Sequence, residues 1–236
     1  MASIKDDLFR EIRHTVLSLV FSVEGLQEIE PGALNFSLLD LEIVSGLSGK
    51  SGNNKITDFS PKVFDGIRMI KRLLVSGHNF THLPPDLFSN TEFLDVQLDM
   101  NHLEELPDGF LRSSPNLTEL SLYGNRLKYI SNKTFEGLTS LSRLYLFRNQ
   151  ITEIPPLTFY ETSLSELYIF GNNITSITKE ALRTRNCTLQ SIHLYYNCLS
   201  IIEEGAFDCT ADGGCKVYYS KNCLSETPHF PAYVRM

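Results

Sequence analysis

Apolar residues recur along this chain in a fixed arrangement around an asparagine. The segment from Leu117 to Leu127 and the segment from Leu141 to Ile151 share one pattern. In each, apolar residues precede the asparagine by eight, five and three positions, and another follows it by two. A fixed period of this length predicts a solenoid. The asparagine column, at steps of 23 to 25 residues, consists of Asn101, Asn125, Asn149, Asn172, Asn197 and Asn222.

Extending the pattern toward the N-terminus adds three further units. His78 occupies the asparagine place in one of them, and in another the asparagine is delayed to Asn54 by an insertion rich in Gly and Ser. We count nine units, starting near residues 16, 38, 70, 93, 117, 141, 164, 189 and 214. The expected organisation is an N-terminal segment over 1–15 and a repeat domain over 16–236. Whether residues 44–53 are ordered stays open.

The residue types explain how such a unit folds. Alternating leucines predict a short strand with its apolar side chains inward. The asparagine turns the chain and bonds backbone groups of neighbouring coils that would otherwise be buried unpaired. One coil cannot bury its own apolar face, so stability comes from stacked neighbours. The second half of most units adds a phenylalanine to the core, at Phe64, Phe88, Phe110, Phe135, Phe159 and Phe207.

The pattern resembles the leucine-rich repeat, LxxLxLxxNxL, over most of the chain. It is similar to arthropod-like extracellular members, among them Toll-type receptor ectodomains and the secreted, non-catalytic repeat subunit associated with shrimp luciferase. The resemblance implies an α/β-type horseshoe with a parallel concave sheet and short helical or irregular convex segments. It also implies binding of a ligand or subunit, without chemistry. The sequence departs from receptors in lacking an N-terminal cysteine cap, a membrane span and a tryptophan near its last cysteines.

Charge and hydropathy exclude several classes of function. The formal charge of -7 and the absence of a Lys/Arg run exclude a nucleic-acid partner. The apolar stretch at residues 16–23 is too short to span a bilayer, so membrane attachment requires a segment outside this sequence. Asp6, Asp7 and Glu11 disfavour reading that stretch as a signal peptide.

Five cysteines cluster between residues 187 and 223 and predict disulfide bonds that close the last coils. Cys198 and Cys223 each follow a column asparagine, so they occupy equivalent places on adjacent coils and are expected to bond. Cys209 and Cys215 are close enough in sequence to close a small loop, which leaves Cys187 free. A bridge between Cys187 and Cys209 is the alternative. No CxxC pair is present, so no metal site is expected.

Six Asn-x-Ser/Thr sequences predict glycosylation and an extracellular location. None of the six belongs to the asparagine column, so each is free to face solvent. Asn and Thr are also common in turn-rich repeats, which is the alternative explanation. The sites are Asn35, Asn79, Asn116, Asn132, Asn173 and Asn186.

Residues between the inward leucines point out of the sheet, and they gather aromatic rings over the later units. An acidic margin, including Asp95, Asp99 and Glu119, flanks these rings. Stacking on neighbouring strands explains such rings by packing alone. A patch of this size with Arg nearby also matches the residues that dominate protein interfaces. The expected partner-binding residues are Tyr123, Tyr145, Phe147, Arg148, Tyr168, Phe170, His193, Tyr195 and Tyr218.

The sequence therefore predicts a secreted module that binds a protein partner or ligand on the concave face. A fragment of a receptor ectodomain is one alternative. A structural matrix protein is another, and it would carry a polar or acidic concave face instead of rings. No catalytic motif is present, so neither enzyme activity nor a cofactor is expected.

Overall fold

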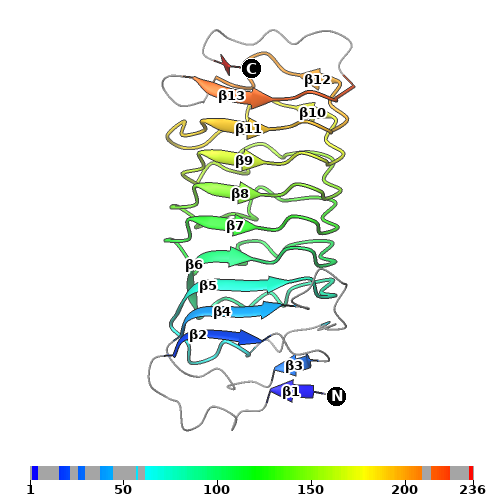
Figure 1. Ribbon diagram of the computed structural model, residues 1–236. Helices are drawn as coiled ribbons and strands as arrows, with labels where there is room; N and C mark the ends of the chain where they lie inside the picture. Colours follow the sequence, from blue (N-terminus) through cyan, green and yellow to red (C-terminus); the bar gives the residue numbers. More distant parts are fainter. Residues whose placement is uncertain are drawn as a thin grey trace.

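In a computed structural model, the chain winds into a column of stacked coils, each contributing one strand to a common sheet (Figure 1). The structure describes residues 62–208 and 214–223 in full, together with Thr57 and the backbone of strands β1 to β4 and β14. The strands are β1 (Ala2–Ile4), β2 (Val16–Phe21), β3 (Leu26–Ile29), β4 (Leu38–Val44), β5 (Met69–Ser76), β6 (Glu92–Gln97), β7 (Glu119–Ser121), β8 (Arg143–Tyr145), β9 (Glu166–Tyr168), β10 (Ser176–Ile177), β11 (Ser191–His193), β12 (Ile201–Ile202), β13 (Cys215–Tyr218) and β14 (Val234–Arg235).

The main sheet has ten strands in the order β14-β13-β11-β9-β8-β7-β6-β5-β4-β2. Every pair is parallel, because each coil returns the chain to the same end before the next strand begins. The register aligns the central leucines, pairing Leu120 with Leu144 and Leu144 with Leu167. The expected parallel solenoid is therefore confirmed. The coil count differs slightly from the expected nine, since the solenoid makes about 6 turns over the described residues.

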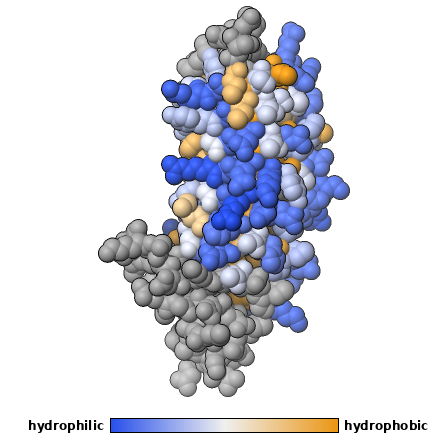
Figure 2. Space-filling model, turned by 90° about the vertical axis from the view of Figure 1, so that its right-hand side faces the viewer, coloured by the Kyte–Doolittle hydropathy of each residue, from blue (hydrophilic) through white to orange (hydrophobic). Residues whose placement is uncertain are grey.

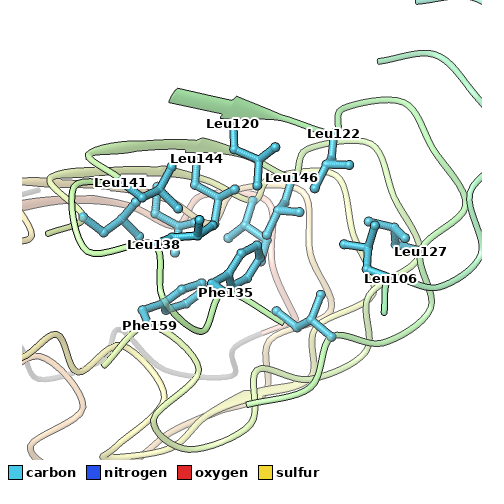
Figure 3. Packing of buried hydrophobic residues seen from close by; sticks show 14 of the residues in the cluster. Leu106, Leu120, Leu122, Leu127, Phe135, Leu138, Leu141, Leu144, Leu146 and Phe159 are labelled. Carbon is cyan, nitrogen blue, oxygen red and sulfur yellow. The ribbon is translucent and has the colours of Figure 1, made fainter. Parts of the chain in front are cut away.

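The inward leucines and the phenylalanines form one continuous core. Leu120, Leu144 and Leu167 are fully buried. Beneath these strand leucines, the rings of Phe135 and Phe159 stack on each other with their centroids 5.7 Å apart (Figure 3). Identical residues recur at one depth in successive coils, so each coil buries its neighbour's apolar face.

None of the fully described residues lies in a helix, so the return segments take the irregular form among the two expected. They consist of isolated turns such as the bond from the Thr134 N–H to the Ser131 carbonyl. Gly137 then adopts a φ of 83°, which ends any helical continuation. Two further parallel sheets have two strands each: one pairs β1 with β3, and the other pairs β10 with β12 on the return side. The sequence pattern predicted neither of them.

Each column asparagine ties its own coil to the preceding one. The Asn149 side-chain oxygen accepts from the Leu127 N–H at 3.0 Å. Its amide nitrogen donates to the carbonyls of Leu122 and Leu146, each at 3.0 Å. The same three-way arrangement occurs at Asn101, Asn125, Asn172, Asn197 and Asn222. His78 occupies the same column, and its N–H donates to Asn101.

The residue directly before each column position has a left-handed backbone. This conformation turns the strand so that the following side chain points inward, and glycine adopts it without steric cost. Only three of the seven positions hold glycine, so the other four carry backbone strain. The seven residues are Gly77, Met100, Gly124, Arg148, Gly171, Tyr196 and Lys221.

The cysteines correct the disulfide prediction. Cys187 is disulfide-bonded, whereas Cys198, Cys215 and Cys223 are free thiols. The predicted bond between Cys198 and Cys223 is wrong because equivalent side chains on parallel coils point the same way. Their Cβ atoms therefore keep the strand spacing of about 4.8 Å, beyond the roughly 3.8 Å that a disulfide needs.

The predicted bond between Cys209 and Cys215 is also wrong, because Cys215 is free and points from β13 into the core. Cys209 itself lies outside the described residues. The expectation that Cys187 is free is wrong as well. The sequence column placed Cys198 and Cys223 at equivalent positions of adjacent coils but did not give the directions of their side chains.

Candidate functional site

The outward positions of the sheet bring the predicted rings together in two columns. The last residues of strands β8, β9, β11 and β13 form the middle ladder, which consists of Tyr145, Tyr168, His193 and Tyr218. Two residues further along each coil lies the side ladder, formed by Tyr123, Phe147, Phe170 and Tyr195. Parallel, in-register pairing causes this alignment, because a shift of one residue would send every ring to the other face.

The rings of each ladder are stacked face to face. Centroid separations lie between 4.4 and 4.8 Å, with interplanar angles of 5° to 15°. This separation matches the distance between strands. Each internal ring therefore uses both of its faces on its neighbours and presents its edge to solvent.

The ladders are half-buried, and their C-terminal end is more open. Tyr218 is 40% exposed, and the adjacent Tyr196 is 59% exposed and meets Tyr195 edge-on at 5.7 Å. Arg148, the predicted cationic contact, lies beside the ladders in the left-handed column and is exposed. The structure thus places the nine predicted residues on one surface, with Arg148 at its border.

A polar first column runs beside the middle ladder. Arg143 forms a salt bridge with Glu119 at 2.6 Å across β7 and β8. The Tyr168 hydroxyl donates to Glu166 at 2.6 Å, and that bond, together with burial, raises the pKa of Tyr168 to about 12. Burial between Tyr168 and Tyr218 lowers the pKa of His193, which favours the neutral ring within the stack.

Asp99 occupies the side-ladder column one coil before the first ring, and it is only 5% exposed. Its carboxylate accepts from the Ser121 hydroxyl at 2.6 Å and from the Tyr123 N–H at 3.0 Å. Burial, together with the nearby charges of Asp95 and Glu119, raises its pKa to about 6 against the opposing effect of those two hydrogen bonds. The sequence placed Asp99 in an acidic margin. Its burial was missed because a column position does not show what covers it.

The predicted glycosylation sites lie away from these outward columns. Asn116, Asn132, Asn173 and Asn186 are exposed, and Asn79 is partly exposed. The Asn116 amide donates to Glu92 at 2.6 Å. Asn35 lies outside the described residues.

The side of the column toward which the strands point is mostly hydrophilic where it is described (Figure 2).

Among the residues that the structure describes, no three His, Cys, Asp or Glu side chains gather as a metal site would require. No helix in that part is long and apolar enough to cross a membrane.

Comparison with known proteins supports the repeat. The family described as "Leucine rich repeat" matches residues 94–151. Podocan-like protein 1 of Mus musculus is 34% identical over 107 residues, which cover 44% of this chain and 19% of the relative. Leucine-rich repeat-containing G-protein coupled receptor 5 of Homo sapiens is 40% identical over 88 residues, covering 37% of this chain and 10% of the relative. Keratocan of Bos taurus is 28% identical over 128 residues, which cover 52% of this chain and 33% of the relative.

The fold has solved counterparts. A chain in the structure of the Drosophila Toll–Spatzle complex aligns with 92% of this chain at a TM-score of 0.59 and 20% identity. The glycosylated form of that complex aligns with 87% at a TM-score of 0.53. The matches span about a third or less of these relatives and structures, between 10% and 36% of their lengths. Together with the parallel solenoid and its asparagine column, these similarities support a leucine-rich repeat protein.

Proposed function

We propose that this chain is a non-catalytic, extracellular binding module that holds a protein partner against the open face of its sheet. That face is the concave face of the expected horseshoe. The observation that carries the proposal is the pair of stacked ring ladders, because eight half-buried rings form a continuous surface on one face. Tyrosine and phenylalanine are enriched where protein interfaces gain their free energy.

The rigidity of the ladders favours binding over packing alone. A ring fixed between two neighbours has already lost its side-chain freedom, so a partner does not have to immobilise it. The five described glycosylation sequences lie outside the ring columns, so sugars attached there leave this face open. Packing alone accounts for the stacking, but it does not account for the absence of the five described glycosylation sequences from this face.

A fragment of a receptor ectodomain is the second candidate. It is favoured by similarity to a leucine-rich repeat-containing G-protein coupled receptor and by the fold shared with the Toll–Spatzle complex. Both candidates use the same surface and place it outside the cell. We also propose, from the sequence pattern, that the repeats are of the arthropod-like type and similar to those associated with shrimp luciferase. A matrix role with a wholly polar sheet face is less well supported, because rings occupy that face.

The test removes rings from the centre of both ladders. Photo-crosslinking of the native chain to an extracellular extract first identifies the partner, which is then purified. The affinity of this partner is measured for the native chain and for the double substitution Tyr168→Ala with Phe170→Ala. We expect affinity to fall by at least about tenfold, as for interface anchors, while the thermal midpoint shows that the variant stays folded. Tyr129→Ala is the matched control, because Tyr129 is 51% exposed and lies off the sheet. Equal binding by all three proteins would refute the proposal.

A further inference from the structure

We propose that the C-terminal end of the sheet face binds an acidic segment of the protein partner through its aspartate or glutamate side chains. The basic end, as we call this surface, consists of Arg148, Tyr196, Lys216, Tyr218 and Lys221. This inference rests on the proposed function and specifies the chemistry of the partner that the sheet face binds.

The side chains of the basic end are open to solvent. All five residues are exposed, whereas the other rings of the two ladders are only partly exposed. None of the salt bridges between described residues involves Arg148, Lys216 or Lys221. The three positive charges are therefore available to a partner.

One row of the basic end follows the left-handed column. Arg148, Gly171, Tyr196 and Lys221 occupy it on four successive coils. The Tyr196 N–H donates to the Ser220 carbonyl at 3.1 Å, which places Tyr196 directly beside Lys221. Gly171 has no side chain, and the Arg148 Cγ lies 3.7 Å from the place that a Cβ would take there. A cation, a gap, a ring and a second cation therefore follow one another along the coils.

Strand β13 adds a second row. Lys216 and Tyr218 are two residues apart on this strand, so their side chains point to the same face. The next strand, β14, pairs Arg235 in register with Lys216, which adds a further arginine to that column of the sheet. The described outward positions from β11 onward hold no Asp or Glu. This end of the face is therefore positive, although the chain carries a formal charge of -7.

The backbone of the left-handed column supports a use outside the fold. Arg148, Tyr196 and Lys221 have φ angles of 56°, 55° and 60°. Glycine adopts this conformation without steric cost, as Gly124 and Gly171 do in the same column. Arg148 and Lys221 are exposed and make no salt bridge with a described residue, so the fold gains little from them in return. Backbone strain of this kind gathers at binding sites.

Carboxylates match the donors of the basic end in kind and in spacing. A guanidinium can bond a carboxylate through two N–H groups, an ammonium attracts it as a point charge, and a tyrosine hydroxyl can donate to it. Coils lie about 4.8 Å apart, so Arg148 and Lys221 are separated by about 14 Å. An extended peptide advances about 3.4 Å per residue. Two acidic residues about four positions apart therefore reach both cations across Tyr196.

The arrangement favours a short acidic peptide over a sulfated polysaccharide. A long polyanion that followed the coils would pass from the basic end toward Asp95, Glu119 and Glu166, whose carboxylates lie on the same face and repel it. A short segment stays on the basic end. The exposed rings of Tyr196 and Tyr218 also offer apolar surface to a peptide.

The experiment measures equilibrium binding to an immobilised Gly-Ser peptide that carries two glutamates four positions apart. A second peptide has glutamine in place of glutamate, and a third has lysine. We expect the glutamate peptide to bind at least about tenfold more tightly than the glutamine peptide and the lysine peptide to bind least. The affinity for the glutamate peptide should fall as salt is added.

The double substitution Arg148→Gln with Lys221→Gln should reduce glutamate-peptide affinity to the glutamine level. Lys133→Gln with Lys179→Gln is the matched control, because it removes the same net charge from exposed residues of the return segments and should bind as the native chain does. Arg148→Lys with Lys221→Arg keeps both charges and should retain most of the affinity, which separates charge from folding.

Three outcomes would overturn the inference. They are equal binding of the glutamate and glutamine peptides, no binding of any peptide, and an equal loss in the Arg148/Lys221 and Lys133/Lys179 glutamine variants. Heparin is the remaining probe. If it binds more tightly than the glutamate peptide and depends on Arg148 and Lys221, the basic end takes a sulfated glycan and the acidic-peptide assignment is wrong.

The purified partner separates this inference from the proposed function. If its binding falls with Tyr168→Ala/Phe170→Ala but not with Arg148→Gln/Lys221→Gln, the sheet face binds protein and the acidic-segment assignment is wrong. If both variants lose binding, both statements are supported. If only the Arg148/Lys221 variant loses binding, the basic end is supported and the role of the ladders is wrong. If neither loses binding, both are wrong.

Discussion

The asparagine column and the ring ladders run along the same coils with the same period, yet they differ in what they contact. Asn149 is 7% exposed and bonds only backbone groups. Tyr168, in the adjacent coil, contacts other side chains and remains partly exposed. Regular spacing alone therefore does not distinguish a structural residue from a binding residue. The direction of the side chain and the kind of group it contacts make that distinction.

Two neighbouring asparagines offer the most severe test of this comparison. Asn172 makes column bonds to Ile151, Leu146 and Ile169, whereas Asn173 is exposed. Asn172→Ala should lower the free energy of unfolding by about 3 kcal/mol, since it leaves buried backbone groups unpaired. Asn173→Ala should change it by less than about 0.5 kcal/mol. Urea unfolding of unglycosylated protein measures both, and equal losses would contradict the assignment.

Asp99 sharpens the comparison because it occupies an outward column yet is buried. Its pKa is raised from 3.8 to about 6, so the native state binds this proton more tightly than the unfolded state. Its contribution to stability is therefore complete below pH 3.8 and is lost as the pH rises through about 6. Asp99→Asn keeps an oxygen that can accept from Ser121 and Tyr123. It should stabilise the chain by about 3 kcal/mol at pH 7.5.

That gain should vanish near the ordinary pKa of the carboxyl, 3.8. Denaturant unfolding of the native chain and the variant at both pH values measures the difference directly. A gain of the same size at both pH values would show that the ionised carboxylate is not its cause.

The cysteines give the smallest effect, which concerns reactivity and not stability. Cys198 and Cys223 are exposed, while Cys215 is buried and burial raises its pKa to about 12. A thiol reagent should modify Cys198 and Cys223 in the folded chain and reach Cys215 only after unfolding, because the thiolate is the reactive form. Peptide mapping by mass spectrometry identifies the modified residues. Protection of Cys198 and Cys223 would indicate that they are bonded after all.

Much of the fold was predictable because its signals are local and repeated. Leu120 and Leu144 mark strands by alternation, and the asparagine spacing sets which residues align between coils. The ring columns followed from the same alignment. These predictions needed only the coil period and the in-and-out alternation of a strand.

Other features depend on three-dimensional detail that the period does not contain. The small β10–β12 sheet involves only two residues from each coil, too few to show a pattern. The disulfide prediction failed at Cys198 because spacing gives a position and not a side-chain direction. The burial of Asp99 depends on Ser121 and Tyr123 from the next coil, so no reading of its own segment could show it.

The asparagine bonds also have a direction along the chain. Asn149 reaches back to Leu127 and Leu122 in the coil before it, and every other column asparagine does the same. During synthesis, each newly made coil therefore keeps an unpaired amide until the ribosome has produced the asparagine of its successor. Each column asparagine, once it has been translated, therefore completes the backbone hydrogen bonds of the coil that precedes it.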